Sequence, residues 1–264
     1  MSPAVVSQVT VLVSLIMRSL SRLVRHDRTG LRILLWHSVS PGRADRGTIN
    51  VAQLERQLQW LRDNRYHVMR FSEVLRRHAA GLPLPPRATV LTFDDACGSF
   101  PRHALPCLQR AGFDATLLVP VAAVTGSTPE SPGIPGHMSI AELEALPDNV
   151  ELGLHSYAHS DYRQMSGQQI RKDLRLCTAL RQRINRKLLP VFAYPFGGVP
   201  REPAVATEMQ QHFAADGIAM GLRIGYGINR WPLQDPWRVR RITVHGTDNF
   251  ARFICKLTLG RVRL

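Results

Sequence analysis

At 264 residues the chain is long enough for one large domain, and its 44% hydrophobic content is that of an ordinary globular protein. Its formal net charge of +14, from 34 lysines and arginines against 20 aspartates and glutamates, favours anionic partners such as acidic glycans or phospholipid headgroups. The arginines are dispersed and are not interleaved with aromatic residues, so we expect no nucleic-acid partner. The four cysteines form no CxxC pair and are predicted to be buried or partly buried free thiols.

Residues 1–28 are predicted to form an apolar and basic leader, separate from a folded domain at residues 29–264. The apolar run at residues 2–17 is shorter than the roughly 20 residues needed to span a bilayer, and it lacks the basic start of a secretory signal. Spaced arginines follow it directly. Such a segment can lie in a membrane interface as a peripheral contact, or it can be a helix packed on the domain.

Beyond the leader, short apolar runs suited to buried strands alternate with amphipathic helices. Strands are predicted at residues 31–36, 66–69, 88–93, 115–119, 150–154, 190–193 and 218–222. Helices are predicted after the cap Asn50, from Ser72, at 104–111, after the capping box Ser139 and Glu142, from Ser166 to Ile184, and at 202–212. A long Gly/Pro/Ser-rich loop is expected at 125–136. Repeated strand-then-helix units imply parallel strands with right-handed crossovers, hence an open α/β sheet or a barrel.

Three polar segments follow predicted strands: Thr92-Phe-Asp-Asp95, His155-Ser-Tyr-Ala-His159 and Tyr194-Pro-Phe-Gly197. The carboxyl ends of parallel strands converge, so these segments are expected on one face of the fold. A single helical turn between His155 and His159 would point both imidazoles the same way. Two histidines and one carboxylate form a three-ligand zinc site with an open position, and the second carboxylate is then free to act as a general base.

Each segment alone has an ordinary explanation. Adjacent aspartates after a strand are often a turn or a helix cap, a His-x-x-x-His pair is often a surface pair on a helix, and Tyr-Pro-Phe-Gly is a turn. Their joint occurrence, each at a strand end, favours a metal-dependent hydrolytic site.

From about Leu31 to Ile242 the chain resembles the polysaccharide deacetylases of the NodB-homology type. Residues 92–95 match the family's Thr-Phe-Asp-Asp-Gly, residues 155–159 match its His-Ser/Thr-x-x-His, and residues 192–197 resemble its third motif. The resemblance implies an α/β fold, a distorted (β/α) barrel of the polysaccharide deacetylase type, and hydrolysis of an N-acetyl amide. Carried over by position, Asp95, His155 and His159 would bind a divalent metal, most often Zn²⁺, and Asp94 would be the base.

Amide hydrolysis also needs an acid that protonates the leaving amine. Leu34-Leu-Trp-His37 resembles a circularly shifted group of the family, in which this histidine follows an N-terminal strand. Ile242-Thr-Val-His245 is a weaker match to the C-terminal Leu-x-Leu-His motif of the commonest members. We predict that His37 is the acid and retain His245 as the alternative.

Two departures from the family pattern concern the base. Ala96 replaces the glycine that follows the two aspartates, so a positive φ there would be strained. The third motif lacks the arginine that normally pairs with the base, and Arg241 is the candidate substitute from another segment.

Substrate contacts are expected from the third motif and from aromatic residues near the C-terminus. The candidates are Tyr194, Pro195, Phe196, Gly197, Trp231, Trp237 and Arg241. A tryptophan there can stack on a sugar ring, and a buried indole is the alternative.

The expected partner is therefore an N-acetylated glycan, with an anionic or lipid-linked glycan favoured by the basic charge and the apolar leader. Two alternatives use the same residues differently. One is a deformylase or other amidase that acts on a small or nucleotide-linked sugar. The other is a catalytically inactive carbohydrate-binding relative, against which the presence of both aspartates and both histidines argues.

Overall fold

The computed structural model describes residues 30–125, 136–178 and 180–260. The predicted leader at residues 1–28 and most of the predicted loop at 125–136 lie outside these described residues. Among the described residues, no helix combines the length and the apolar character needed to cross a membrane.

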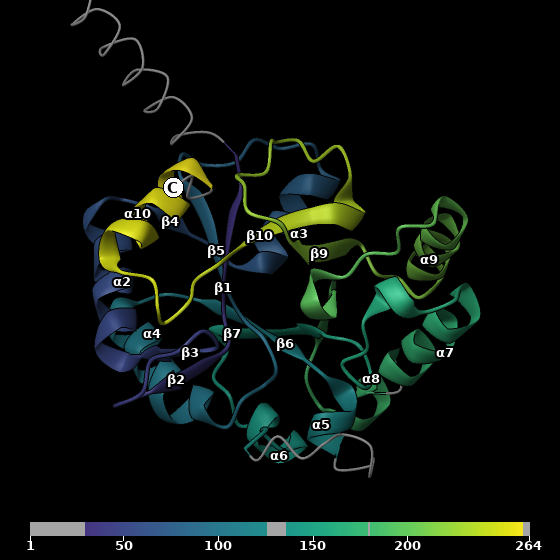
Figure 1. Ribbon diagram of the computed structural model, residues 1–264, viewed down its shortest axis with the longest axis horizontal. Helices are drawn as coiled ribbons and strands as arrows, with labels where there is room; N and C mark the ends of the chain where they lie inside the picture. The colour runs from purple at the N-terminus through teal and green to yellow at the C-terminus, as the bar shows by residue number, and fades with distance from the viewer. Residues whose placement is uncertain (1–29, 126–135, 179, 261–264) are drawn as a thin grey trace, which may run out of the picture.

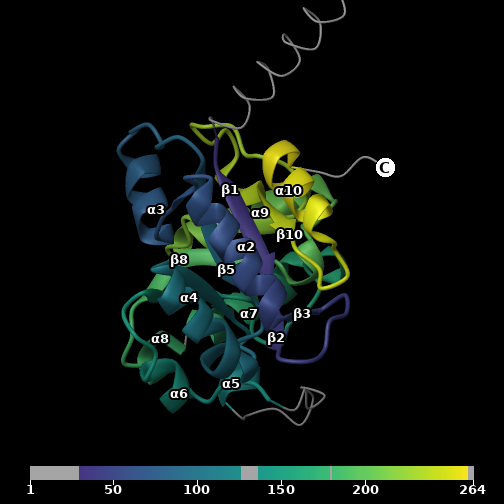
Figure 2. The ribbon, with the colours of Figure 1, turned by 90° about the vertical axis from the view of Figure 1, so that its left-hand side faces the viewer.

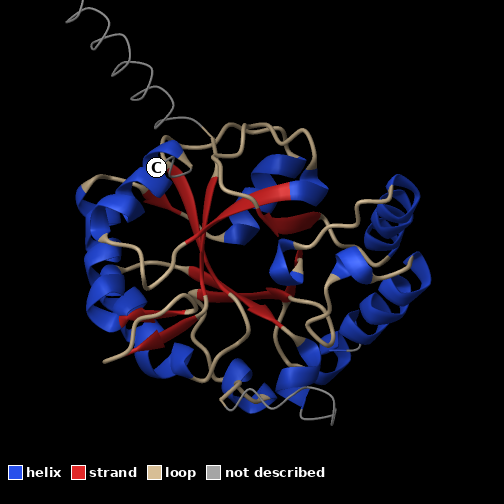
Figure 3. Ribbon diagram, viewed as in Figure 1, coloured by secondary structure: helices blue, strands red, loops and turns tan. Residues whose placement is uncertain are grey.

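Within the described residues, seven parallel strands form a closed barrel, which is the fold that the family resemblance implied and one of the two that the alternation of strands and helices allowed (Figure 3). The barrel closes because β1 (Arg32–Trp36) pairs with β10 (Val239–Thr243) on one side and with β5 (Ala88–Phe93) on the other. In spatial order the strands are β1 (Arg32–Trp36), β10 (Val239–Thr243), β9 (Met220–Ile224), β8 (Leu188–Ala193), β7 (Val150–Leu154), β6 (Ala115–Val119) and β5 (Ala88–Phe93). The two-residue β4 (His67–Val68) pairs with the start of β5.

Helices surround the barrel on the outside (Figure 1). They are α2 (Val51–Asp63), α3 (Phe71–Ala79), α4 (Leu105–Ala111), α5 (Val121–Thr125), α6 (Ile140–Glu144), α7 (Gly167–Thr178), α8 (Leu180–Arg183), α9 (Pro203–Ala215) and α10 (Phe250–Leu259). Shorter elements are the π-helix η1 (Phe100–Ala104), the 3₁₀ turns η2 (Tyr162–Gln164), η3 (Pro195–Gly197) and η4 (Pro236–Arg238), and the paired strands β2 (Ser38–Ser40) and β3 (Thr48–Asn50).

The strands are apolar on both faces because one face packs inside the barrel and the other packs against helices. Along β1, Leu34 and Trp36 join the outer cluster with Leu58 of α2, whereas Ile33 joins the inner cluster. The Trp36 indole stacks on Phe93 at 5.3 Å between ring centroids and donates from Nε1 to Gln57 Oε1 at 3.1 Å. These contacts fix α2 against β1, and α10 lies beside α2 (Figure 2).

The N-terminal ends of the helices can be compared with the predicted caps. Both capping boxes are confirmed: Asn50 with Gln53 at the start of α2, and Ser139 with Glu142 at the start of α6. Helix α3, however, begins at Phe71 and not at Ser72. Its first amides donate instead to Glu151 Oε2 of β7, at 2.8 Å from Phe71 N and 3.2 Å from Ser72 N.

The helix predicted from Ser166 to Ile184 corresponds to α7 and α8, and residue 179 between them lies outside the described residues. No strand was predicted at β10 and no helix at α10. All four cysteines are free, as predicted, but Cys255 is exposed, so the expectation of burial was wrong for that residue.

Candidate metal and catalytic site

Asp94 follows the last residue of β5, and it is held there by a buried arginine. Its amide donates to Trp36 O at 2.9 Å, which ties the ends of β5 and β1 together. Arg241 of β10 donates to both carboxylate oxygens, Nη1 to Oδ1 at 2.6 Å and Nη2 to Oδ2 at 2.8 Å. The predicted pairing of Arg241 with Asp94 is thus confirmed. Arg241 is 0% exposed and its side chain holds Asp94, and the substrate contact expected of Arg241 stays a prediction.

The charge state of Asp94 follows from this environment. Burial raises the pKa of this carboxyl, but the charges of Arg241, His155 and His37 lower it, and the pKa falls to about 2. Asp94 is therefore a carboxylate at neutral pH. The contribution from His37 also shows that its ring lies within electrostatic reach of Asp94.

Asp95, His155 and His159 form a compact cluster of metal-ligand atoms. One ligand atom from each lies within 4.8 Å of the others. Asp95 Oδ1 is 3.5 Å from His155 Nε2 and 3.4 Å from His159 Nε2. That oxygen is buried and accepts no hydrogen bond from the described residues. A buried carboxylate oxygen without a donor is costly, and a cation between it and the two imidazoles would satisfy it.

The surroundings of His155 and His159 favour neutral imidazole rings. The carbonyl of Ala193, the last residue of β8, lies 2.8 Å from His155 Nδ1, so this nitrogen carries the proton and Nε2 faces the aspartates. Burial, with the neighbouring His155, lowers the pKa of His159, which favours the neutral imidazole that metals bind. The donor set of one carboxylate and two imidazoles therefore fits a divalent metal, most naturally zinc.

The segment from His155 to His159 is a bend and not the helical turn predicted from their spacing. Ser156 has φ 65° and His159 has φ 54°, so the chain reverses between them and still brings the two rings to 4.8 Å. Asp173 of α7 holds this bend in place. Its carboxylate accepts from Ser156 Oγ at 3.2 Å, from Tyr157 N at 3.1 Å and from Tyr162 Oη at 2.8 Å.

Asp173 was missed by the sequence analysis. It lies on the buried stripe of α7, where an acidic residue beside Ile170, Leu174 and Cys177 is the signal that could have identified it.

Backbone strain also concentrates at this site. Asp95 has φ 72° and Ala96 has φ 47°, so the strained conformation expected where alanine replaces the family's glycine is present. Ala96 is fully buried, and its carbonyl accepts from Met138 N at 2.8 Å. The surrounding contacts hold the turn that points Asp95 toward the histidines.

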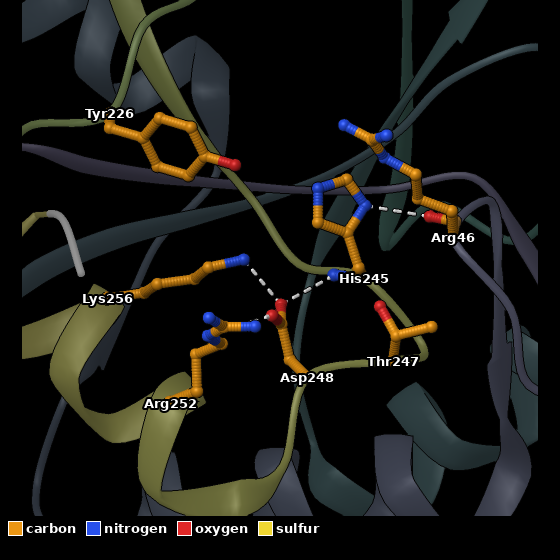
Figure 4. Close-up of a pocket in the computed structure, with 7 residues that line it drawn as sticks. All are labelled: Arg46, Tyr226, His245, Thr247, Asp248, Arg252 and Lys256. Atoms are coloured by element: carbon orange, nitrogen blue, oxygen red, sulfur yellow. Dashed lines mark hydrogen bonds and ion pairs between the residues drawn. The ribbon is translucent and has the colours of Figure 1, made fainter. Parts of the chain in front are cut away.

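His37 and His245 follow neighbouring strands, because β1 and β10 pair with Leu35 opposite Thr243. His37 is close enough to Asp94 and His159 for its charge to act on both. His245 instead lines a pocket with Arg46, and its Nδ1 lies 2.7 Å from Arg46 O (Figure 4).

The third motif divides into a buried part and an exposed part. Tyr194 is 0% exposed, and its hydroxyl donates to Trp237 O at 2.9 Å, so its side chain belongs to the core. Pro195 is also buried. Phe196 is 58% exposed, and its ring lies 4.8 Å from the His159 ring. Gly197 has φ 66°, and a Cβ there would lie 2.6 Å from Ile224 Cβ, so only glycine fits.

Neither candidate tryptophan joins the cluster. Trp231 donates from Nε1 to Leu82 O at 2.8 Å and packs with the inner cluster beside α3, near the amino ends of the strands. Trp237 packs against Phe213 of α9, with ring centroids 5.6 Å apart, on the outside of the sheet. Both indoles are partly buried, so neither is the fully buried indole of the alternative, and the stacking of these indoles on a sugar ring stays a prediction.

Comparisons with known proteins agree with this geometry. A sequence model described as polysaccharide deacetylase matches residues 82–213, half of the chain. A poly-beta-1,6-N-acetyl-D-glucosamine N-deacetylase of Escherichia coli K12 is 35% identical over 105 residues, which cover 39% of this chain and 15% of that protein. The chain thus matches only a small part of this longer relative.

Solved structures show the same fold. The deacetylase PplD of Streptococcus pyogenes, in complex with acetate, superimposes with a TM-score of 0.72 at 19% identity and covers 87% of this chain and 99% of its own. IcaB from Ammonifex degensii gives a TM-score of 0.69 at 22% identity and covers 89% of this chain and 98% of its own. With the half-chain sequence match and the paired aspartates and histidines at the barrel end, the chain belongs to the polysaccharide deacetylase family of hydrolases.

Proposed function

We propose that this chain is a metal-dependent de-N-acetylase that hydrolyses the acetamide of N-acetylated sugars in a polysaccharide or a lipid-linked glycan. The observation that carries the proposal is the cluster of Asp95, His155 and His159 beside the arginine-bound Asp94. The buried Oδ1 of Asp95 accepts no hydrogen bond from the described residues, whereas both oxygens of Asp94 accept from Arg241.

Asp95, His155 and His159 would hold the metal. A divalent cation bound there would supply Lewis acidity, lowering the pKa of water and polarising the acetamide carbonyl. A lowered pKa of the water agrees with the pKa of about 2 at Asp94. So weak a base removes a proton only from acidified water.

Asp94 would act as the general base. Arg241 uses one acceptor direction on each carboxylate oxygen, and each oxygen keeps a further lone pair. Oδ2 lies 3.6 Å from His155 Nε2, so the free lone pair borders the cluster. The bidentate pairing also fixes the orientation of the carboxylate, so little reorganisation is needed when it accepts the proton.

His37 would donate the proton to the leaving amine. It directly follows β1, whose last carbonyl accepts from Asp94 N, so the backbone places it beside the base. Its charge lowers the pKa of both Asp94 and His159, which agrees with a position near the cluster. The exposed Phe196 ring, packed on His159, would form an apolar wall for the sugar or its acetyl group.

Replacing each histidine in turn separates the two candidates for the acid. In the His37→Ala variant the rate of acetate release should fall about 10²-fold to 10⁴-fold, the usual contribution of a general acid. The matched His245→Ala variant should retain most of that rate. Full activity in His37→Ala would remove the assignment.

The proposed function is tested by acetate release from N-acetylglucosamine oligomers combined with metal analysis of the purified protein. We expect bound metal and acetate release in the parent and neither in the His155→Ala variant. Release of formate from N-formyl sugars without acetate release would favour the deformylase alternative. Binding of oligomers without any hydrolysis by the metal-loaded protein would favour the inactive carbohydrate-binding alternative.

The proposal also divides the chain into two parts. Residues 29–264 would form the catalytic domain, and residues 1–28 would make a peripheral membrane contact. The apolar run and the arginines that follow it support this second part.

A further inference from the structure

A basic pocket of about 480 Å³ lies beside the candidate site (Figure 4). Its lining includes three basic residues and one carboxylate, Arg46, Arg252, Lys256 and Asp248, together with His245. Tyr226 completes one wall, and its hydroxyl points toward His245.

The pocket opens at the same end of the barrel as Asp94. Strands β1 and β10 are neighbours, and Val244 N donates to Leu35 O at 2.9 Å, one residue before His245. On the other side of β1, Asp94 N donates to Trp36 O, one residue before His37. A glycan held at the metal cluster would therefore have the pocket within reach of its neighbouring sugars.

Asp248, the carboxylate among the residues that line the pocket, already has hydrogen-bond and ion-pair partners. Asp248 is 4% exposed, accepts from His245 N at 2.8 Å and forms an ion pair with Lys256 Nζ. Lys256 also donates to Thr243 O at 2.9 Å. The Asp248–Lys256 pair is thus a neutral part of the wall.

The two guanidiniums supply the remaining charge. Arg252 Nε lies 4.0 Å from Asp248 Oδ1, too far for a hydrogen bond. In the part of the chain that the structure describes, the Arg46 side chain forms no ion pair. The pocket therefore carries an excess of positive charge on donors with the geometry for bidentate binding of an oxyanion.

The walls of the pocket are fixed to one another. A Cβ at Gly246 would lie 2.0 Å from Thr48 O, so only glycine lets the turn after β10 approach the start of β3 so closely. Gln53 Nε2 donates to Gly246 O at 3.0 Å, and His245 Nδ1 lies 2.7 Å from Arg46 O. Burial raises the pKa of Tyr226, which keeps its hydroxyl as a donor.

We propose that this pocket is an oxyanion subsite that binds a carboxylate or phosphate group carried by the glycan, through Arg46 and Arg252. The inference rests on the proposed function, because it places the charged group on a sugar near the acetamide that is hydrolysed. The net charge of +14 on the whole chain adds a field that attracts such a substrate.

The test compares three N-acetylglucosamine oligomers of equal length: one neutral, one phosphorylated and one carrying a carboxylate. Acetate release gives kcat/KM for each oligomer, and calorimetry gives each Kd. The variants are Arg252→Gln and Arg46→Gln, with Arg171→Gln as the matched control. Arg171 is an exposed residue of α7, outside this pocket, and its replacement lowers the net charge by the same amount.

The parent should prefer an anionic oligomer over the neutral one. In Arg252→Gln and in Arg46→Gln the ratio of anionic to neutral kcat/KM should fall about tenfold or more, as expected for a lost charge-assisted hydrogen bond. In Arg171→Gln the ratio should not change. The anionic group with the larger loss identifies the ligand.

Equal ratios in parent and pocket variants would overturn the subsite, as would an equal loss in Arg171→Gln. If the parent releases no acetate from any oligomer, the proposed function fails, and the calorimetric comparison still decides the inference. In that case a pocket variant that binds the anionic oligomers as tightly as the parent would refute the subsite.

Discussion

The two adjacent aspartates differ in their partners, and this difference separates their proposed roles. Both oxygens of Asp94 are bonded to a buried guanidinium, and its pKa is about 2. Asp95 points the other way because both it and Ala96 have positive φ, and its Oδ1 is left facing two imidazoles. The backbone turn, and not the side-chain chemistry, therefore separates the proposed base, Asp94, from the proposed metal ligand, Asp95.

Asparagine at each aspartate tests this separation. Asp94→Asn should retain metal but lose acetate release by about 10²-fold to 10⁴-fold, because the general base is removed. Asp95→Asn should lose both metal and activity, because a ligand is removed. Metal analysis and acetate assays of the two variants check this. Loss of metal in Asp94→Asn, with metal retained in Asp95→Asn, would reverse the assignment.

At the scale of elements, the bend between β7 and η2 depends on one buried carboxylate of α7. Asp173 is 6% exposed and accepts hydrogen bonds from Ser156, Tyr157 and Tyr162. It touches neither metal ligand directly and acts by positioning the segment between them. The spacing of the two histidines could not predict the contact of Asp173 with the segment between them, since this contact joins a loop to a helix that comes later in the chain.

Replacing Asp173 with asparagine should weaken metal binding about 10-fold to 100-fold, as is typical when the support of a metal ligand is removed. The metal dissociation constant, measured by competition with a chelator, checks this. The control is Asp148→Asn, since Asp148 is exposed. Restoration of activity by excess metal would show positioning, and unchanged metal affinity in folded Asp173→Asn would contradict it.

Helix α3 makes a contribution to the stability of the fold that depends on pH and does not involve the candidate site. Hydrogen bonds from Arg76 and then Arg77 outweigh burial and lower the pKa of Glu73 from 4.5 to about 2. Because the folded-state pKa is lowered, the stabilisation is present above pH 4.5 and is lost as the pH falls toward 2. The Tm difference between the parent and Glu73→Gln should be constant near neutral pH and shrink between these values.

Thermal unfolding at a series of pH values measures this difference. High salt should reduce it at neutral pH, because the ion pairs are exposed. A Tm difference that grows as the pH falls from 4.5 would contradict the assignment.

At the scale of the whole molecule, the buried pair of Arg241 and Asp94 links β10 to β5 across β1. Removing one partner leaves a buried charge without compensation. Arg241→Met should therefore lower the free energy of unfolding by about 3–5 kcal/mol. Arg240→Met is the matched control, because Arg240 is the exposed neighbour on the same strand. Denaturant unfolding measures both, and equal destabilisation of the two variants would refute a structural role for the pair.

Most of the barrel could be predicted because its strands are apolar and alternate with periodic helices. Strand β10 was missed because its sequence, Val-Arg-Arg-Ile-Thr, has low hydropathy, and Arg241 is buried only because Asp94 neutralises it. The start of α3 was misplaced for a similar reason, since its cap comes from Glu151 on a distant strand. The three motifs identified the cluster, whereas the burial of Tyr194 and the partial burial of both tryptophans depended on packing that sequence does not record.

The most direct test of the central claim is acetate release from N-acetylglucosamine oligomers by protein stripped of metal with a chelator. The rate is measured before and after addition of one equivalent of Zn²⁺. The account predicts almost no release from the stripped protein and recovery of the rate with zinc in the parent, but no recovery in His155→Ala. Equal rates in stripped and zinc-loaded protein would contradict it.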